Sequence, residues 1–179
     1  MGQIVNLRRI GNSPADPRRH LLPTTLVVYN KLLMLRDPSL IPLSQQHHNG
    51  LALCVLTRRA LAGDASAENV AKLARRVIDR YELELANHFE IEEQVLFPEC
   101  GPIPLVSDLL GEHRAIEAFI AELRTAPSGA LLEQFCALLS KHIRREENEL
   151  FELVQAVLPR QVLDRLGCEI DRRAVRICL

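Results

Sequence analysis

The hydrophobic and polar positions between Leu85 and Phe97 repeat with the period of an α-helix. Four apolar residues lie on or beside one stripe of that helix: Leu85, Ile91, Val95 and Leu96. His88 and Glu92 are four residues apart on the same stripe, so the imidazole stacks over the carboxylate on the face that points into a core. The pattern therefore predicts a long helix that buries a histidine and an acidic residue together.

A second copy of this pattern begins at His142. The stretches 88–97 and 142–151 both read H-x-x-x-E-E-x-x-L-F, so Glu146 corresponds to Glu92. A chain that twice buries a histidine and a carboxylate is predicted to hold a metal, because an unpaired buried carboxylate is costly. The acidic residues that follow, Glu93 and Glu147, are expected to continue the polar faces of their helices.

The same periodicity, read with the turn residues, predicts an all-α chain. Two prolines hold residues 36–43 extended, and Ser44 and Ser66 can each cap a helix. We expect long helices over 44–62, 67–97, 105–124 and 130–157, followed by a short helix near 160–166. Four long helices with short connections predict an up-down-up-down four-helix bundle, in which the second and fourth helices are parallel.

Three parts of the chain are expected. Residues 1–35 are an N-terminal extension of mixed basic and turn-forming character, predicted to be loosely ordered. Residues 36–158 form the bundle, and residues 159–179 form a C-terminal segment that packs on it. The length of 179 residues suits one domain with extensions.

Every predicted long helix carries at least one histidine. The first helix has two adjacent candidates, His47 and His48, and either would place apolar residues at helical spacing behind it. The others carry His88, His113 and His142, and Glu92 and Glu146 add two carboxylates. These ligand types suit iron, with manganese and zinc ranked below it, and exceed what one tetrahedral zinc needs. Two carboxylates could bridge a pair of ions roughly 3.5–4 Å apart.

With these residues in place, the chain resembles the hemerythrin-like (HHE cation-binding) domain over about residues 36–158. The segments LSQQHH, HFEIEEQVLFPE, EHRAIE and HIRREENELF correspond to the four motifs of that family. The resemblance implies a four-helix bundle around a non-haem di-iron centre. It implies His88, His113 and His142 as terminal ligands, Glu92 and Glu146 as bridging carboxylates, and one further histidine from the first helix.

Two departures bear on function. Glu117 stands where oxygen-carrying hemerythrins have a second histidine on the third helix, and the repeat favours Glu146 over the position of Glu147, where those proteins have an aspartate. A centre richer in carboxylate resembles the redox-sensing, nitric-oxide-handling or iron-handling members. We therefore expect a di-iron protein that binds or senses O2, NO or redox state. The alternatives are a di-iron oxidoreductase or iron-centre repair protein, and a metal-free structural bundle.

The amino-acid composition narrows the expected fold class, partners and cellular location. Aromatic residues make up only 4% of the chain, which has no tryptophan, and this favours a helical bundle. The net charge of −1, without a basic cluster, argues against a nucleic-acid partner. The apolar stretch 21–35 is too short and too interrupted to span a membrane. Five cysteines without C-x-x-C spacing or a recognisable secretion signal indicate reduced thiols in the cytoplasm.

Overall fold

The computed structural model describes residues 35–176, and all regular secondary structure in this range is helical. The all-α prediction is confirmed for this range, whereas the predictions for residues 1–34 and 177–179 lie outside it. Contacts define a compact unit that begins at Arg36. In chain order, its elements are η1 (Pro38–Leu40), α2 (Ile41–Gly63), α3 (Ala67–Arg80), η2 (Tyr81–Leu85), α4 (Ala86–Ile91), η3 (Glu92–Leu96), α5 (Phe97–Cys100), α6 (Pro104–Thr125), α7 (Gly129–Arg145), η4 (Glu146–Leu150), α8 (Phe151–Val157) and α9 (Arg160–Arg173).

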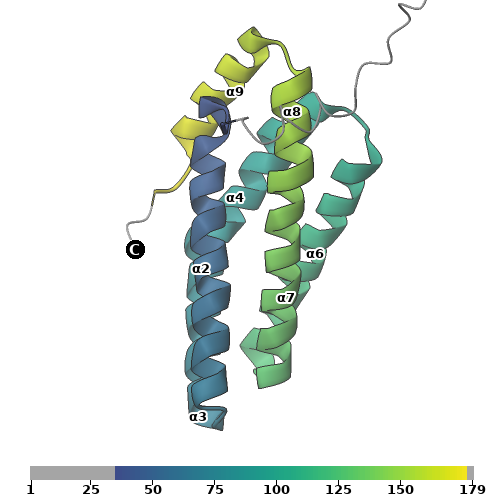
Figure 1. Cartoon of the computed structure of the whole chain (residues 1–179). Coiled ribbons are helices and arrows are strands. Elements are labelled where there is room, and N and C mark those ends of the chain that lie inside the picture. The colour runs from purple at the N-terminus through teal and green to yellow at the C-terminus, as the bar shows by residue number, and fades with distance from the viewer. Residues whose placement is uncertain (1–34, 177–179) are drawn as a thin grey trace, which may run out of the picture. The chain divides into compact units, whose positions relative to one another are not determined.

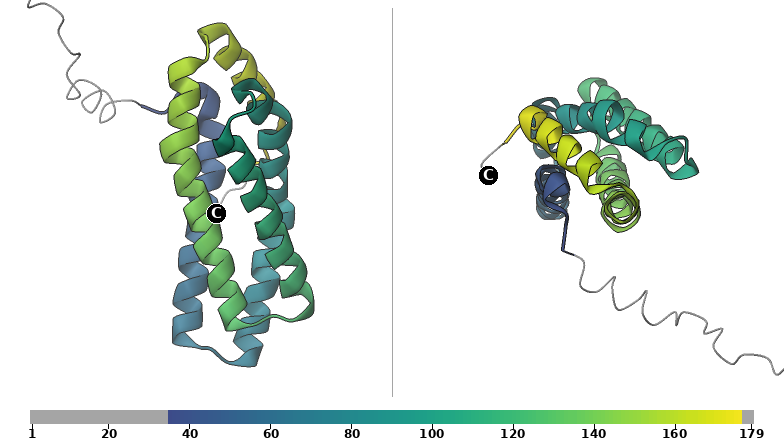
Figure 2. Two further views of the ribbon diagram at one scale, coloured as in Figure 1. Left: turned by 90° about the vertical axis from the view of Figure 1, so that its right-hand side faces the viewer. Right: turned by 90° about the horizontal axis from the view of Figure 1, so that it is seen from above.

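These elements join into long helical runs that lie lengthwise beside one another, as Figures 1 and 2 show. The runs are α2, α3 through α5, α6, and α7 through α8. Serine side chains cap the N-terminal ends of two of these runs. Ser66 accepts from the Asn69 N–H at 3.3 Å, and Ser128 accepts from the Leu131 N–H at 3.2 Å. These bonds satisfy amide groups that a helix N-terminus leaves without partners.

The first long helix begins earlier than predicted. Pro38 and Pro42 do not hold the chain extended; they occupy the first turns of η1 and α2, where the missing proline N–H is no loss. Asp37 caps η1 by accepting from the Ser39 N–H at 3.0 Å. Ser44 is therefore not a cap, and its hydroxyl instead donates to Glu147 at 2.7 Å.

Three segments of these runs are π-helical, and two of them coincide with the sequence repeat. η3 begins at Glu92 and η4 at Glu146, the two repeated acids. In each, the wider turn closes with a bond from the phenylalanine N–H (Phe97 or Phe151) to the glutamate carbonyl five residues earlier. Single π turns inside α-helices are frequent at functional sites. The repeat in sequence is thus also a repeat in backbone structure.

The core is divided into two apolar clusters along the length of the bundle. One contains Phe135 and Ile143 among others, and the second contains Leu40, Leu109 and Phe151. On each long run, the buried histidine lies within about one turn of the place where the chain passes from one cluster to the other. The bundle therefore contains a buried polar layer sealed by apolar packing on both sides.

The helix α9 covers the cluster nearer the start of α2, across one end of the bundle (Figure 1). It continues to Arg173, beyond the predicted 160–166, because Gly167 does not end it. A Cβ at Gly167 would lie 2.8 Å from the Ser39 Cβ, so the glycine allows α9 to approach η1 closely. Within the described range, no helix combines the length and apolar character needed to cross a bilayer.

Candidate metal centre

The buried polar layer contains one histidine from each long run. His47, His88, His113 and His142 are all at most 2% exposed. Of the two candidates on α2, His47 faces inward, whereas His48 lies exposed and outside the cluster. Gly50 lies on the same face as His47, and a Cβ there would come within 2.9 Å of Ile143. The absent side chain lets this face of α2 approach α7 closely, and His48, on a different face of the helix, lies in solvent.

Two carboxylates lie between two pairs of histidines, His47 with His88 and His113 with His142. Glu92 and Glu146 are both 0% exposed. Glu92 Oε2 is 3.3 Å from the Nε2 atoms of His88 and His113, whereas Glu146 Oε2 is 3.1 Å from those of His47 and His142. The resulting groups are His47, His88, Glu92, Glu146 and Glu92, His113, His142, Glu146, and in each the candidate ligand atoms lie within 4.8 Å of one another. Each carboxylate is thus shared between a pair on one side and a pair on the other.

The Nδ1 atom of each histidine is occupied by an acceptor on a neighbouring helix. His47 Nδ1 lies 2.7 Å from Glu147 Oε1, and His113 Nδ1 lies 2.8 Å from Glu93 Oε1. The remaining two contacts join His88 Nδ1 to Gln46 Oε1 at 2.9 Å and His142 Nδ1 to Glu112 Oε2 at 3.0 Å. Since carboxylate and amide oxygens only accept, each Nδ1 carries the hydrogen in these bonds.

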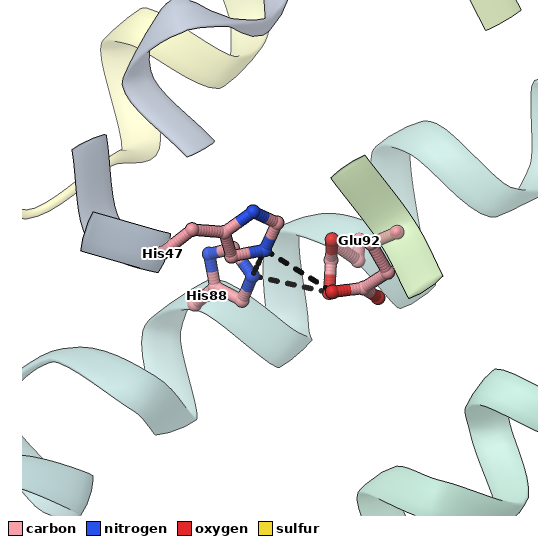
Figure 3. Close-up of side chains that lie close together, drawn as sticks. His47, His88 and Glu92 are labelled. Atoms are coloured by element: carbon pink, nitrogen blue, oxygen red, sulfur yellow. Dashed lines mark hydrogen bonds and ion pairs between the residues drawn. The ribbon is translucent and has the colours of Figure 1, made fainter. Parts of the chain in front are cut away.

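It follows that all four Nε2 atoms present lone pairs to the interior when the rings are neutral. His47 Nε2 and His88 Nε2 are only 2.9 Å apart, and Figure 3 shows these rings approaching one another beside Glu92. Several of these buried atoms have no hydrogen-bond partner among the described residues: both oxygens of Glu92 and Glu146, and Nε2 of His113 and His142. The layer contains acceptors facing acceptors, an arrangement that bound cations satisfy.

The spacing of these atoms fits metal coordination. Ligands about 2.1 Å from one ion and 90° apart are separated by about 3.0 Å, from the bond lengths typical of imidazole and carboxylate ligands. The closest distances between candidate ligand atoms here are 2.9–3.3 Å. Several of these nitrogen and oxygen atoms are close enough to form an ion pair but do not meet the criteria for a hydrogen bond. Such an arrangement is expected for groups that are directed at a common point.

Comparison with known families agrees with this geometry. A family model, the hemerythrin HHE cation-binding domain, matches residues 42–154. The chain belongs to this family. A search among curated proteins found no match, and neither did a search among solved structures. The match spans all four histidines and both carboxylates of the HHE domain described above.

Protons are the other cations that can occupy the HHE centre. Burial alone would lower the pKa of His47, but the carboxylates of Glu146 and Glu147 outweigh it and raise that pKa to about 9. The pKa of Glu147 is lowered to about 2, because His47, Ser44 and Arg36 outweigh the effect of burial. In the metal-free HHE domain, the carboxylates therefore hold a proton on the His47 ring, and metal uptake must displace it.

The hydrogen-bond acceptors of the Nδ1 atoms were not predicted from the sequence. The prediction that Glu93 and Glu147 only continue polar faces is wrong, because each accepts from a ligand-candidate histidine across a helix interface. The signal was present: both copies of the repeat carry a second glutamate. Glu117 pairs instead with Arg114 at 2.8 Å and lies outside the cluster.

The repeated phenylalanines complete the symmetry of the HHE centre. Phe97 stacks on His113 with ring centroids 5.7 Å apart, and Phe151 stacks on His47 at 5.2 Å. Phe89 adds a closer stack on His113, at 3.9 Å. These rings fix the imidazole planes and exclude water from the layer, which strengthens the electrostatic interactions within it.

Proposed function

We propose that this protein is a non-haem di-iron protein that binds a small diatomic ligand, O2 or NO, or senses redox state through its centre. The observation that carries the proposal is the convergence of four imidazole nitrogens and two carboxylates, all buried and all presenting lone pairs. Membership of the HHE cation-binding family supports a cation as the occupant. A metal-free structural bundle is disfavoured, since six buried atoms of the centre have no hydrogen-bond partner among the described residues.

In this proposal, one ion would be held by His47 and His88 and the other by His113 and His142. Glu92 and Glu146 would be ligands common to both ions, as their positions between the histidine pairs support. Each ion would receive four protein ligands, fewer than an octahedral ion takes, so a small molecule can complete the set. The mixture of imidazole and carboxylate favours iron over manganese and zinc.

Bound iron would supply reversible one-electron chemistry and affinity for diatomic ligands. The chain supplies the rest: Nδ1 hydrogen bonds orient the rings, and phenylalanines keep bulk water out. Such a sealed layer admits small molecules more readily than large substrates, which supports a diatomic ligand.

The proposal extends to the architecture and surroundings. We take the four long runs to alternate in direction as an up-down-up-down bundle, since their connections 64–66, 101–103 and 126–128 are only three residues long. The thiols of Cys54, Cys100, Cys136 and Cys168 are free, which is consistent with a reducing compartment such as the cytoplasm. No nucleic-acid partner is proposed.

The test is spectroscopic. Protein loaded anaerobically with Fe(II) is exposed separately to O2 and NO while visible absorption and Mössbauer spectra are recorded. We expect new absorption bands with each ligand or with oxidation, and their loss in Glu92→Ala. Spectra that ignore O2, NO and oxidants would refute the proposal, whereas catalytic turnover that disappears in Glu92→Ala would favour the oxidoreductase alternative.

A further inference from the structure

The two histidine pairs differ in one of the hydrogen bonds behind them. His142 Nδ1 donates to the carboxylate of Glu112 at 3.0 Å, whereas His88 Nδ1 donates to the amide oxygen of Gln46 at 2.9 Å. The two acceptors occupy equivalent places, because each immediately precedes the inward-facing histidine of its own helix. The other two Nδ1 atoms both face carboxylates, Glu147 and Glu93.

The orientation of the Gln46 amide is fixed by the chain that follows α9. Gln46 Nε2 donates to the Val175 carbonyl at 3.1 Å, so Oε1 is the atom left for His88. Asn87 holds the same segment: its Oδ1 accepts from the Val175 N–H at 3.0 Å, and its Nδ2 donates to the Arg173 carbonyl at 3.2 Å. A carboxylate at position 46 would face the Val175 carbonyl instead of donating to it. The neutral acceptor behind His88 is therefore built into the packing.

The surrounding charges leave this difference largely intact. Glu147 is paired with Arg36 and also accepts from the Ser44 hydroxyl, and Glu93 is paired with Arg114, so both of these carboxylates are compensated by other donors. Glu112 is also approached by cations, Lys141 at 3.1 Å and Arg145 at 3.3 Å, but both contact Oε1. Its Oε2 atom remains for His142. Oε2 of each bridging glutamate is equally distant from a histidine of either pair, so Glu112 against Gln46 is the difference in formal charge among the four Nδ1 acceptors.

A carboxylate behind a ligating imidazole raises the electron density at the coordinating nitrogen more than an amide does, because the charged acceptor makes the stronger bond. Removing such outer partners typically weakens metal binding roughly 10- to 100-fold. We propose, on the basis of the proposed di-metal function, that the two positions are unequal. The His113/His142 position binds its ion more tightly, and the His47/His88 position is the exchangeable one, with Gln46 and Glu112 as the positioning residues that set the difference.

The acceptor behind the exchangeable position, Gln46, also lines a cleft. A cavity of about 220 Å³ is lined by Gln46, Asn49, Glu84 and the segment 174–176, among others. Glu84 is only 3% exposed there and accepts from Asn49 at 2.7 Å. The weaker position is thus the one whose outer hydrogen bond borders an opening in the surface.

The test is a stepwise titration of the full metal-free chain with Co2+, in which binding is measured by calorimetry and by visible absorption. Wild-type protein should bind two ions in distinguishable steps. Glu112→Gln should weaken the tighter step by roughly 10- to 100-fold, and Gln46→Glu should strengthen the weaker step while leaving the tighter one unchanged. Glu117→Gln is the matched control, since this acid on the same helix as Glu112 pairs only with Arg114 at the surface. It should change neither step.

The outcomes separate this inference from the proposed function. No Co2+ binding to the wild type would overturn the proposed function and with it the basis of the inference. Two ions bound, with Glu112→Gln leaving the tighter step unchanged, would overturn the inference alone, as would Gln46→Glu strengthening the tighter step. Because Gln46→Glu also removes the bond to Val175, its fold is checked by circular dichroism. Should it fail to fold, Glu112→Gln still decides the question.

Discussion

Replacing Glu92 by glutamine tests the shared carboxylate most sharply. Its Oε2 lies 3.3 Å from nitrogen atoms on both sides of the layer, so one substitution affects both metal positions. Glutamine preserves the volume of the side chain and removes its charge. The expected loss is therefore of metal binding rather than of packing.

The size of the effect follows from linkage between binding and folding. A ligand present at 100 times its Kd stabilises the folded state by about 2.7 kcal/mol. Two such ions give roughly 5 kcal/mol, which for a domain of this size corresponds to a rise in Tm of roughly 15 °C. If Glu92→Gln weakens each position 100-fold, the same concentration contributes only about 0.4 kcal/mol at each. The rise in Tm should then fall to a few degrees.

The assay is anaerobic thermal unfolding with and without Fe(II), and circular dichroism monitors the loss of helix. Each protein is compared with its own metal-free form, so any effect of the substitution on the metal-free fold cancels. The matched control is Glu90→Gln, an exposed acid on the same helix as His88, which should keep the full rise in Tm. A Glu92→Gln protein that retains the wild-type rise would refute the bridging role.

Three further outcomes are expected. The pKa of His47 is raised to about 9 in the folded state, so its protonated ring stabilises the metal-free protein fully below pH 6.5. This contribution is lost as the pH rises through about 9. The Tm of the metal-free protein should therefore fall between pH 6.5 and 9. Gly167→Ala should destabilise the fold by about 1–3 kcal/mol in urea unfolding, because its Cβ would lie 2.8 Å from the Ser39 Cβ. Glu93→Gln should weaken metal binding by roughly 10- to 100-fold in a Co2+ titration, because it removes the charged acceptor of His113 Nδ1.

Each of these has a control or a contrary result. In the iron-loaded protein, the His47 ring is a neutral ligand, so stability should not fall between pH 6.5 and 9; the same fall in both forms would contradict the assignment. Gly111→Ala, on an exposed face of α6 with nothing within 4 Å, should instead stabilise the protein by about 0.4–1 kcal/mol. Unchanged Co2+ affinity in Glu93→Gln would show that this outer hydrogen bond does not support the ligand.

Periodicity alone located much of the centre. A histidine and a glutamate four residues apart share a helix face, so the inward direction of His88 with Glu92, and of His142 with Glu146, follows from the spacing and the apolar stripe beside them. The repeat added the expectation that both pairs meet. These are local properties, and the buried positions of the four residues agree with them.

The rest depended on how helices pack. His47 and His48 both have apolar residues at helical spacing, so the packing of α2 against its neighbours, including the close approach to α7 at Gly50, decides which one faces inward. The hydrogen bond from His113 to Glu93 joins different helices, and single-helix periodicity says nothing about such partners. The π turn that begins at Glu92 likewise leaves no mark in the hydrophobic pattern.

The central claim is that imidazoles and carboxylates from all four long runs share two cations in one buried layer. Inductively coupled plasma mass spectrometry of anaerobically purified protein, with protein concentration from amino-acid analysis, measures this directly. We expect two iron ions per chain in the wild type and fewer than one in Glu92→Gln. A wild-type chain without bound metal after purification and after reconstitution with Fe(II), or equal metal content in both proteins, would contradict it.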